Sequence, residues 1–426
     1  MFISLLIFSI LIPPLGLFCG LFGLVMDRKH WKGYVFCLAL TMASIAYCYY
    51  PKGDPDIIRY IAHVKQIGRY SLPRAMTIGI HGEANLYTFT FVCWVIAKLG
   101  DPQLLPALSV FCVYYVAFYI TCKLAEDTHA RSRNLIFYLL FIICSLNLYE
   151  MINNVRNVCA FALVSFAVFR EMYMKKRDIL TLVLYVFPLF LHTSAILLVL
   201  IRLIVKYTGK IKLVLFLLVS NVMLLIDLAY AIVTRIGSGN IVISLIRNLV
   251  VKGYIYFHNT TSDWGRVVSN SLSYKVERVA NVALAFIVSY LIFYIAQKKI
   301  TAKGGGLLAL LPWESERLHT NQFVAWNNYC FMLALSTIAC LPMIMPEYWR
   351  FFSITVICSS LPFLILTEQR KQFVRLRGFL IFAVTPLCFM LMLKFILYSD
   401  RKALLLGPFV SSPLLVAGKS LVHLFF

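Results

Sequence analysis

Three carboxylates in the first polar stretch of the sequence have the chemistry of a general base. Asp54 and Asp56 occur in GDPDIIRY (residues 53–60), and Glu83 occurs in HGEAN (residues 81–85). A carboxylate that a short rigid helix holds in place can accept the proton of an incoming hydroxyl. A structural interpretation also stands, because acidic residues cap the amino end of a helix or complement its dipole. Asp54, Asp56 and Glu83 are therefore the candidate catalytic residues.

Basic side chains lie where an anion would bind. Arg156, in NNVRN (residues 153–157), and Arg350, in PEYWR (residues 346–350), each open an apolar segment. An arginine at the amino end of a helix opposes the helix dipole unless an anion shares the site, and a guanidinium suits phosphate. Two such arginines fit a diphosphate, with Arg59 and His192 as further candidates. The alternative is that these arginines reach toward lipid headgroups.

A long segment near the middle of the chain combines aromatic and polar side chains. Residues 234–278 include Tyr254, and the segment has the composition of a sugar-binding lid. Long extracellular loops have this composition for many other reasons. Tyr254 is a candidate substrate-binding residue on this basis.

Composition decides which class of protein carries these residues. Hydrophobic residues make up 61% of the 426 positions and charged residues 14%, with a mean hydropathy of +0.83. These values exclude a soluble domain, and the spanning elements are predicted to be helices because lipid cannot satisfy exposed backbone groups. The net charge of +22 is dispersed over short loops, which favours a membrane protein over a nucleic-acid-binding one.

The cysteines and the first apolar segment exclude further classes. The 12 cysteines are scattered without a Cys-x-x-Cys pair, so no metal or cofactor is predicted and packing explains them. The first apolar segment has neither a basic region before it nor a small-residue cleavage site after it, which indicates a retained helix rather than a signal peptide.

The distribution of positive charge predicts the orientation of the chain. Six basic loops are expected on the cytoplasmic side, and they lie at 28–32, 123–133, 170–177, 202–212, 298–317 and 370–377. Alternation between these loops predicts one transmembrane domain (1–426) of about twelve helices with its amino terminus outside. These helices are expected near 2–26, 33–50, 104–122, 135–151, 157–172, 179–191, 193–208, 213–231, 279–297, 322–341, 351–367 and 378–397.

Two of the expected outer segments are long loops, at residues 51–103 and 234–278, and the short ones are the turns at 153–156 and His192 and the segment 343–350. The first should hold an amphipathic helix with Ile57, Ile58, Ile61 and Val64 on its apolar face. A juxtamembrane helix should follow at 86–99, because that apolar segment is too short to span and the charge rule allows only one crossing before residue 123.

The order and spacing of these motifs resemble the Wzy-type bacterial polysaccharide polymerases, in particular the EpsG-like branch. The resemblance covers about residues 30–400. It rests on DPDxxRY (54–60), EANLY (83–87), NNVR (153–156), FLHTSA (190–195) and WRF (349–351). The family's acidic motif often carries a second tyrosine where this chain has Ile61, so no role is assigned to Tyr60.

The resemblance implies an all-α polytopic protein with a layout similar to GT-C glycosyltransferases. It implies an enzyme in the bacterial inner membrane that joins undecaprenyl-diphosphate-linked oligosaccharide repeat units on the outer face. A chain-length regulator and a flippase would be its partners beside the lipid bilayer. The alternative is a flippase or transporter of the same lipid-linked oligosaccharide, and a membrane acyltransferase is a third, less favoured possibility.

Overall fold

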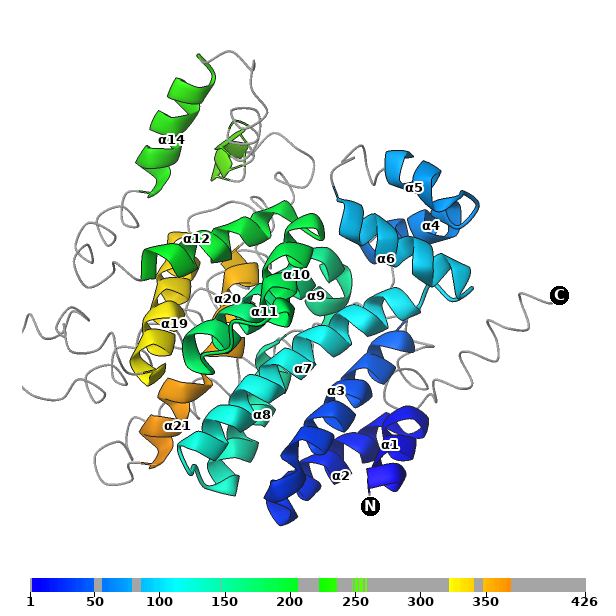
Figure 1. Cartoon of the computed structure of the whole chain (residues 1–426), viewed down its shortest axis with the longest axis vertical. Helices are drawn as coiled ribbons and strands as arrows, with labels where there is room; N and C mark the ends of the chain where they lie inside the picture. Colours follow the sequence, from blue (N-terminus) through cyan, green and yellow to red (C-terminus); the bar gives the residue numbers. More distant parts are fainter. Residues whose placement is uncertain are drawn as a thin grey trace, which may run out of the picture. The chain divides into compact units, whose positions relative to one another are not determined.

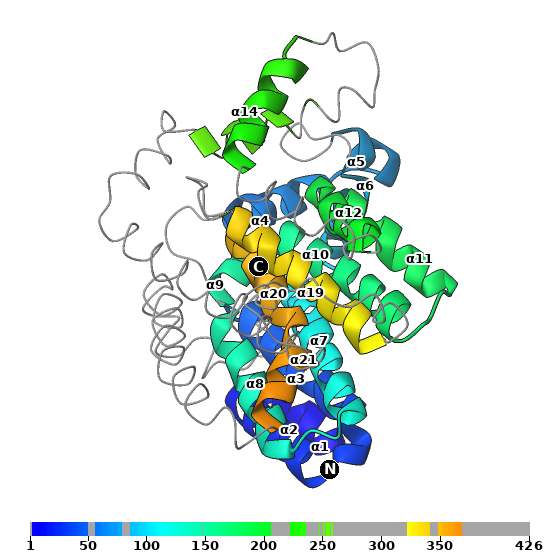
Figure 2. The same ribbon diagram turned by 90° about the vertical axis from the view of Figure 1, so that its left-hand side faces the viewer.

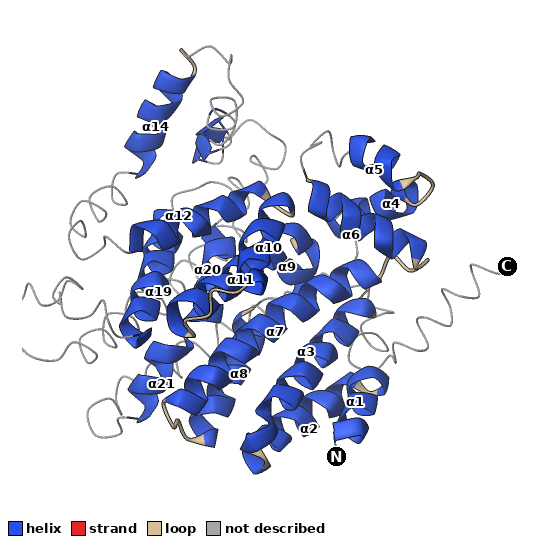
Figure 3. Cartoon of the chain, in the orientation of Figure 1, coloured by secondary structure: helices blue, strands red, loops and turns tan. Residues whose placement is uncertain are grey.

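The computed structural model describes residues 2–49, 56–78, 86–146, 148–205, 222–235, 322–340 and 348–368, and several positions between 247 and 258. All elements of this described part are helical (Figure 3). The chain divides into two compact units, residues 1–202 with 356–426, and residues 203–355.

The first unit is built on helices that lie side by side. Its α-helices are α1 (Phe2–Leu11), α2 (Pro13–Met26), α3 (Trp31–Tyr47), α4 (Asp56–Ile67), α5 (Leu72–Ile78), α6 (Tyr87–Lys98), α7 (Leu104–Asp127), α8 (Ser132–Ser145), α9 (Leu148–Asn153), α10 (Val155–Val168), α11 (Ile179–Val186), α12 (Ile196–Val205) and α21 (Ser360–Glu368). Short helical turns are η1 (Arg28–His30), η2 (Phe169–Tyr173), η3 (Phe187–Phe190) and η4 (Thr193–Ala195).

Helix α7 is the centre of this unit. It packs along α3 and α10, and Figures 1 and 2 both show α3 running beside it. Its 24 residues make it the one described helix that is long and apolar enough to cross a membrane by length and composition. Seven shorter apolar helices of 10–17 residues accompany it in the described part of the chain. The predicted all-α class is confirmed for the described residues, whereas the predicted number of twelve spans is not established.

Several predicted single helices are interrupted. The segment predicted as one helix over 2–26 is two helices, because Pro13 and Pro14 lack the N–H that would continue α1. The two helices fold against each other so closely that a Cβ on Gly16 would lie 2.6 Å from the Cα of Ser9. The segments predicted at 135–151 and 351–367 are likewise each divided, with breaks after Ser145 and Cys358.

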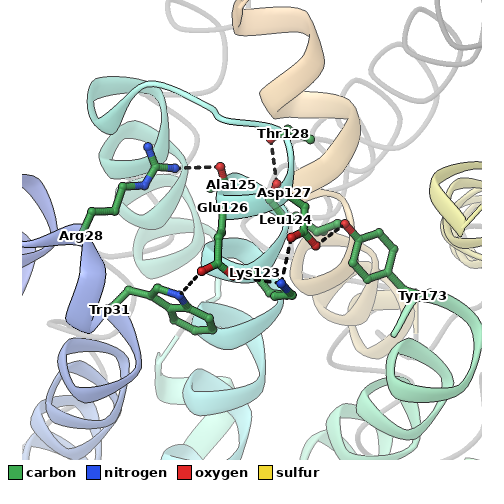
Figure 4. A network of polar contacts seen from close by, with 9 residues as sticks. All are labelled: Arg28, Trp31, Lys123, Leu124, Ala125, Glu126, Asp127, Thr128 and Tyr173. Atoms are coloured by element: carbon green, nitrogen blue, oxygen red, sulfur yellow. Dashed lines mark hydrogen bonds and ion pairs between the residues drawn. The ribbon is translucent and has the colours of Figure 1, made fainter. Parts of the chain in front are cut away.

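The predicted basic loops meet at one end of the first unit. Arg28 donates hydrogen bonds to the carbonyl oxygens of Ala125, at 2.7 Å, and Ala130. The Trp31 indole donates to Glu126 at 3.2 Å. Figure 4 shows this network around the end of α7.

The same network continues into the next two basic loops. Tyr173 donates to Asp127 at 2.7 Å, and Arg202 pairs with Glu171 at 2.6 Å. Four of the six loops thus adjoin one another, as expected for loops on one side of a membrane. The other two, at 298–317 and 370–377, lie outside the described residues, and the cytoplasmic location of this side stays a prediction.

Asp178 is the residue before α11 and caps the amino end of that helix. Its carboxylate accepts a hydrogen bond from the Thr181 backbone N–H at 2.9 Å and pairs with the buried Arg170 at 2.6 Å. The Arg170 guanidinium and the Thr181 backbone N–H lower the pKa of Asp178 below its ordinary value of 3.8.

We therefore expect Asp178→Asn to destabilise the protein at neutral pH, because it leaves the Arg170 charge without its carboxylate. A lowered pKa means that the carboxylate stabilises the fold above its ordinary pKa and loses that effect as the pH falls toward the lowered value. The difference in unfolding temperature between wild type and variant should therefore be constant near neutrality and shrink below about pH 4. A difference that does not change with pH would contradict this assignment.

The second unit is described by three helices. They are α14 (Val222–Val233), α19 (Gln322–Ala339) and α20 (Tyr348–Cys358), the last of which ends beyond the unit boundary. The hydroxyls of Thr337 on α19 and Thr355 on α20 are 3.1 Å apart. The predicted helices at 279–297 and 378–397 lie outside the described residues.

Candidate functional site

Helix α4 forms the predicted amphipathic element of the first outer loop. It begins at Asp56, and its buried face consists of Ile57, Tyr60, Val64 and Ile67. The predicted face was wrong in part, since Ile58 is 37% exposed. The spacing of three and four residues between the buried positions is that of one helical stripe. Tyr60 belongs to this stripe, which the sequence interpretation missed.

The short apolar segment at 86–99 is the helix α6, as predicted. It packs against α4 and α5, and Figure 1 shows the three helices together near the start of α7. Phe89 of α6 is 2% exposed and meets the Tyr60 ring edge-on at 5.6 Å between centroids. Helices α4 and α6 therefore share an aromatic contact.

Arg156 reaches this aromatic contact from α10. Its Nε donates a hydrogen bond to the Tyr60 hydroxyl at 3.1 Å. Its Cζ atom lies 5.1 Å from the centroid of the Tyr60 ring and 5.5 Å from that of Phe89. Three elements that are distant in sequence, α4, α6 and α10, thus hold one guanidinium. Cation–π contacts of this kind are stronger when partly desolvated.

The break between α9 and α10 explains the position of Arg156. Helix α9 ends at Asn153, and α10 begins at Val155, so Arg156 is the second residue of α10. Asn154 donates to Glu150 at 3.0 Å, and no side chain caps the amino end of α10 from the Asn154 position. The first N–H groups of a helix and a guanidinium are both electropositive. The start of α10 is therefore electropositive, which is what the predicted anion site requires.

Asn153 is a buried polar residue at the break between α9 and α10. Its Nδ2 donates to the Tyr149 carbonyl at 2.9 Å, while its buried Oδ1 accepts no hydrogen bond from the described residues. Buried polar atoms without partners are rare and costly. This oxygen suits a bound hydroxyl or water at the helix break.

His192 lies in the turn that follows η3. Its Nδ1 accepts a hydrogen bond from the Ser194 backbone N–H at 3.3 Å, so the ring is neutral with its proton on Nε2 when this bond is made. The flanking elements η3 and η4 both contact α10, and η3 also contacts α6, where Phe190 and Tyr87 have ring centroids 6.2 Å apart. The predicted candidate thus belongs to a turn that packs on the helices holding Arg156.

Asp56 and Arg59 pair with each other within α4. Their side chains form an ion pair and are 49% and 54% exposed, respectively. The pair is a contact within one helix, and the predicted role of Arg59 as an anion ligand stays a prediction. The other predicted carboxylates, Asp54 and Glu83, lie outside the described residues.

Two predicted residues belong to the second unit. Arg350 is the third residue of α20, at the amino end of that helix as expected. Tyr254 stacks on Tyr230 with 3.9 Å between ring centroids. A shared anion site for Arg350 and Arg156 stays a prediction, because the two units are described separately.

The described residues contain no group of three or more His, Cys, Asp or Glu side chains that could hold a metal ion. The described cysteines are free thiols, most of them buried. At Arg156 the structure places a guanidinium beside the first N–H groups of α10, and the helix α4 that supplies Tyr60 to it also contains the Asp56 carboxylate.

Comparison with known proteins supports the family resemblance that the sequence motifs indicated. The chain matches the EpsG family over residues 32–406, most of its length. Neither the curated proteins nor the solved structures contain a match.

Proposed function

Because the chain belongs to the EpsG family, we propose that it is a polysaccharide polymerase that joins undecaprenyl-diphosphate-linked oligosaccharide repeat units on the outer face of the bacterial inner membrane. Family membership and the apolar helices support a membrane protein of polysaccharide biosynthesis. We propose, beyond family membership, that the donor is lipid-linked, that the site faces outward and that the reaction is glycosyl transfer.

The guanidinium of Arg156 is the observation that carries the proposal. A positive side chain at the positive end of α10 is unfavourable without an anion. Tyr60 and Phe89 nevertheless hold it there, with 3.1 Å from Nε to the tyrosine hydroxyl. A lipid diphosphate is the anion that a membrane polymerase would bring to this position.

The reaction follows from this placement. The hydroxyl oxygen of an acceptor repeat unit attacks the anomeric carbon of the donor, and the bond from that carbon to the diphosphate oxygen breaks. Arg156 and the first N–H groups of α10 stabilise the charge that develops on the leaving diphosphate. The acceptor proton passes to a carboxylate of the outer loop, for which Asp54, Asp56 and Glu83 are the candidates.

Other residues have supporting roles in this proposal. His192 and Arg350 are further diphosphate ligands. A flippase that delivers the lipid-linked repeats and a chain-length regulator would be partners.

A deletion strain tests polymerisation against transport. We expect single lipid-linked repeat units that have reached the outer face, where an added glycosidase can digest them in intact spheroplasts. Repeats that stay protected until the membrane is opened would show that the protein moves them, and the polymerase assignment would then be wrong.

A further inference from the structure

Two short apolar arms beside α10 form a helical hairpin. The first arm is α11 with η3 (Ile179–Phe190), and the second is η4 with α12 as far as Arg202. Together they form the short hairpin (residues 179–202). The first arm rises about 18 Å along its axis, and Thr193 and Arg202 of the second arm are about 14 Å apart. Each arm is much shorter than the roughly 30 Å of hydrocarbon in a typical bilayer.

The short hairpin has polar groups at both ends. At its base, Asp178 pairs with Arg170 at 2.6 Å, and Arg202 pairs with Glu171 at 2.6 Å. Asp178 is 51% exposed, so the base lies at a polar surface. At the tip, where the chain turns, the sequence is His-Thr-Ser (residues 192–194). The apolar part is therefore limited to the length of the arms.

The outward faces of both arms are apolar. Their exposed side chains, between 37% and 62% exposed, include Leu182, Val186, Phe190, Leu197 and Leu200. A contiguous exposed apolar surface of this kind marks contact with a partner or with a membrane. In a membrane protein whose arms run between two polar ends, the tails of lipid molecules are the occupant that fits this surface.

Helix α7, which also packs on α10, has the length that the short hairpin lacks. From Leu104 to Lys123 it rises about 29 Å, which matches the hydrocarbon core of a bilayer. Lys123 pairs with Asp127 at 2.8 Å, and Tyr173, at the end of η2, donates to the same carboxylate at 2.7 Å. The charged end of α7 thus lies at the level of the end of η2, close to the base of the short hairpin.

At its other end, α7 extends beyond the start of α10. Ser109 of α7 donates a hydrogen bond to the Val155 carbonyl oxygen of α10 at 2.9 Å. Ser109 and Asp127 are 18 positions apart on α7. Val155 and Tyr173 are also 18 positions apart, so the two helices run parallel and in register. Since Leu104 precedes Ser109 by five positions, α10 starts about 8 Å inside the apolar band of α7.

The tip of the short hairpin lies at the same level as the start of α10. Asp178 and His192 are 14 positions apart, and so are Arg170 and Arg156. Because Asp178 and Arg170 pair at the base, the tip comes level with Arg156, and η3 and η4 both contact α10. The polar tip and the Arg156 guanidinium are thus grouped at a depth where a flat bilayer around α7 would place hydrocarbon.

We propose that the short hairpin thins the bilayer locally, so that lipid headgroups and water reach the level of Arg156 on the hairpin side of the protein. A span that is shorter than the hydrocarbon is accommodated by local thinning or by flanking side chains that reach the interface. The side chains of Thr193 and Ser194 are too short to reach it, so the bilayer adapts. A lipid phosphate then meets the guanidinium without entering hydrocarbon, where an unpaired charge is costly.

This inference goes beyond the proposed function, because it concerns the lipid around the protein and holds whichever reaction Arg156 serves. Nitroxide labels at two positions of matched level test it. Thr193 is exposed at the tip, and Leu108, 46% exposed on α7, precedes the Ser109 that bonds to α10. Each label is attached singly through a genetically encoded ketone amino acid, which leaves the cysteines unreacted. The full-length protein is reconstituted in dioleoyl phosphatidylcholine vesicles.

Collision of each label with a water-soluble nickel complex and with oxygen, calibrated with spin-labelled lipids, measures its depth. We expect the label at position 193 at headgroup depth and the label at position 108 about 6 Å inside the hydrocarbon, the rise of four residues from Leu104. A third label, at the exposed Val186 in the first arm, should collide with oxygen and hardly with nickel.

Equal depths at positions 193 and 108 would overturn local thinning, whether both labels lie in hydrocarbon or both at the headgroups. A label at position 186 that collides with nickel would show an aqueous cleft in place of lipid and would also overturn the proposal. The measurement needs no substrate, so a failure of the polymerase assignment would leave these results unchanged.

Discussion

Replacing Arg156 with alanine is expected to abolish polymer while single lipid-linked repeat units accumulate. The substitution removes the guanidinium that lies at the amino end of α10, 5.1 Å from the Tyr60 ring. Loss of one preorganised group that stabilises developing charge costs about 100- to 1,000-fold in rate. The measurement is the rate of repeat addition by purified protein, alongside the glycan ladder of cells carrying the variant.

Arg74 provides a matched control for this experiment. Its Cζ atom lies 5.1 Å from the centroid of the Tyr70 ring, the same separation, but the residue is exposed on α5 and far from the start of α10 in sequence. Arg74→Ala should therefore polymerise like the wild type. Arg156→Lys should recover little activity, because an ammonium has neither the Nε donor nor the planar fork of arginine. Normal ladders from Arg156→Ala in folded protein would exclude the proposed role.

Tyr60→Phe is expected to slow repeat addition on the order of tenfold without unfolding the protein. The phenylalanine keeps the ring against Phe89 but removes the hydroxyl that accepts the Arg156 Nε–H at 3.1 Å. A hydrogen bond to a charged group contributes about 1.5 kcal/mol, which corresponds to roughly tenfold in rate. Tyr60→Ala should be more severe, because it also removes a buried ring of α4.

The two kinetic constants distinguish positioning from a merely structural role. If Tyr60 aims Arg156 at the leaving group, Tyr60→Phe lowers kcat more than it raises KM and leaves the unfolding temperature nearly unchanged. The control is Tyr70→Phe. The Tyr70 ring makes the same kind of cation–π contact, with Arg74, but not with Arg156. An equal loss of activity in both variants, or a large fall in unfolding temperature for Tyr60→Phe, would contradict a positioning role.

Much of the site's framework was predictable from the sequence. The length of the apolar segment at 86–99 predicted a short helix, and α6 occupies Tyr87–Lys98, while its location outside the membrane stays a prediction. The motif at 153–157 predicted a helix opening beside Arg156, and α10 begins at Val155. These two helices were predictable because they rest on local constraints, namely segment length and the types of residue at a helix end.

The partners of Arg156 were not predictable in the same way. No role was assigned to Tyr60 because Ile61 departs from the family's acidic motif, and the predicted apolar face did not include it, although a stripe through positions 57, 60, 64 and 67 has the better helical spacing. Its contact with Arg156 joins residues 96 positions apart. Tertiary packing decides such contacts, and a single sequence contains no direct record of it.

Breaks within apolar segments limited the prediction of the fold. Pro13 and Pro14 mark the end of α1, and Pro362 lacks the N–H that would bond to the Cys358 carbonyl, so both breaks had a readable signal, whereas the break after Ser145 has no proline or glycine at it.

Reconstitution of the reaction from purified components shows whether this protein itself joins lipid-linked repeat units. Purified full-length protein in liposomes is mixed with lipid-linked single repeats from a deletion strain, and the products are separated by length while free undecaprenyl diphosphate is measured. We expect a ladder of longer glycans and the release of one lipid diphosphate for each linkage formed, both lost in Arg156→Ala. Single repeats that stay unjoined with folded wild-type protein, or a ladder that forms without release of lipid diphosphate, would contradict the proposed function.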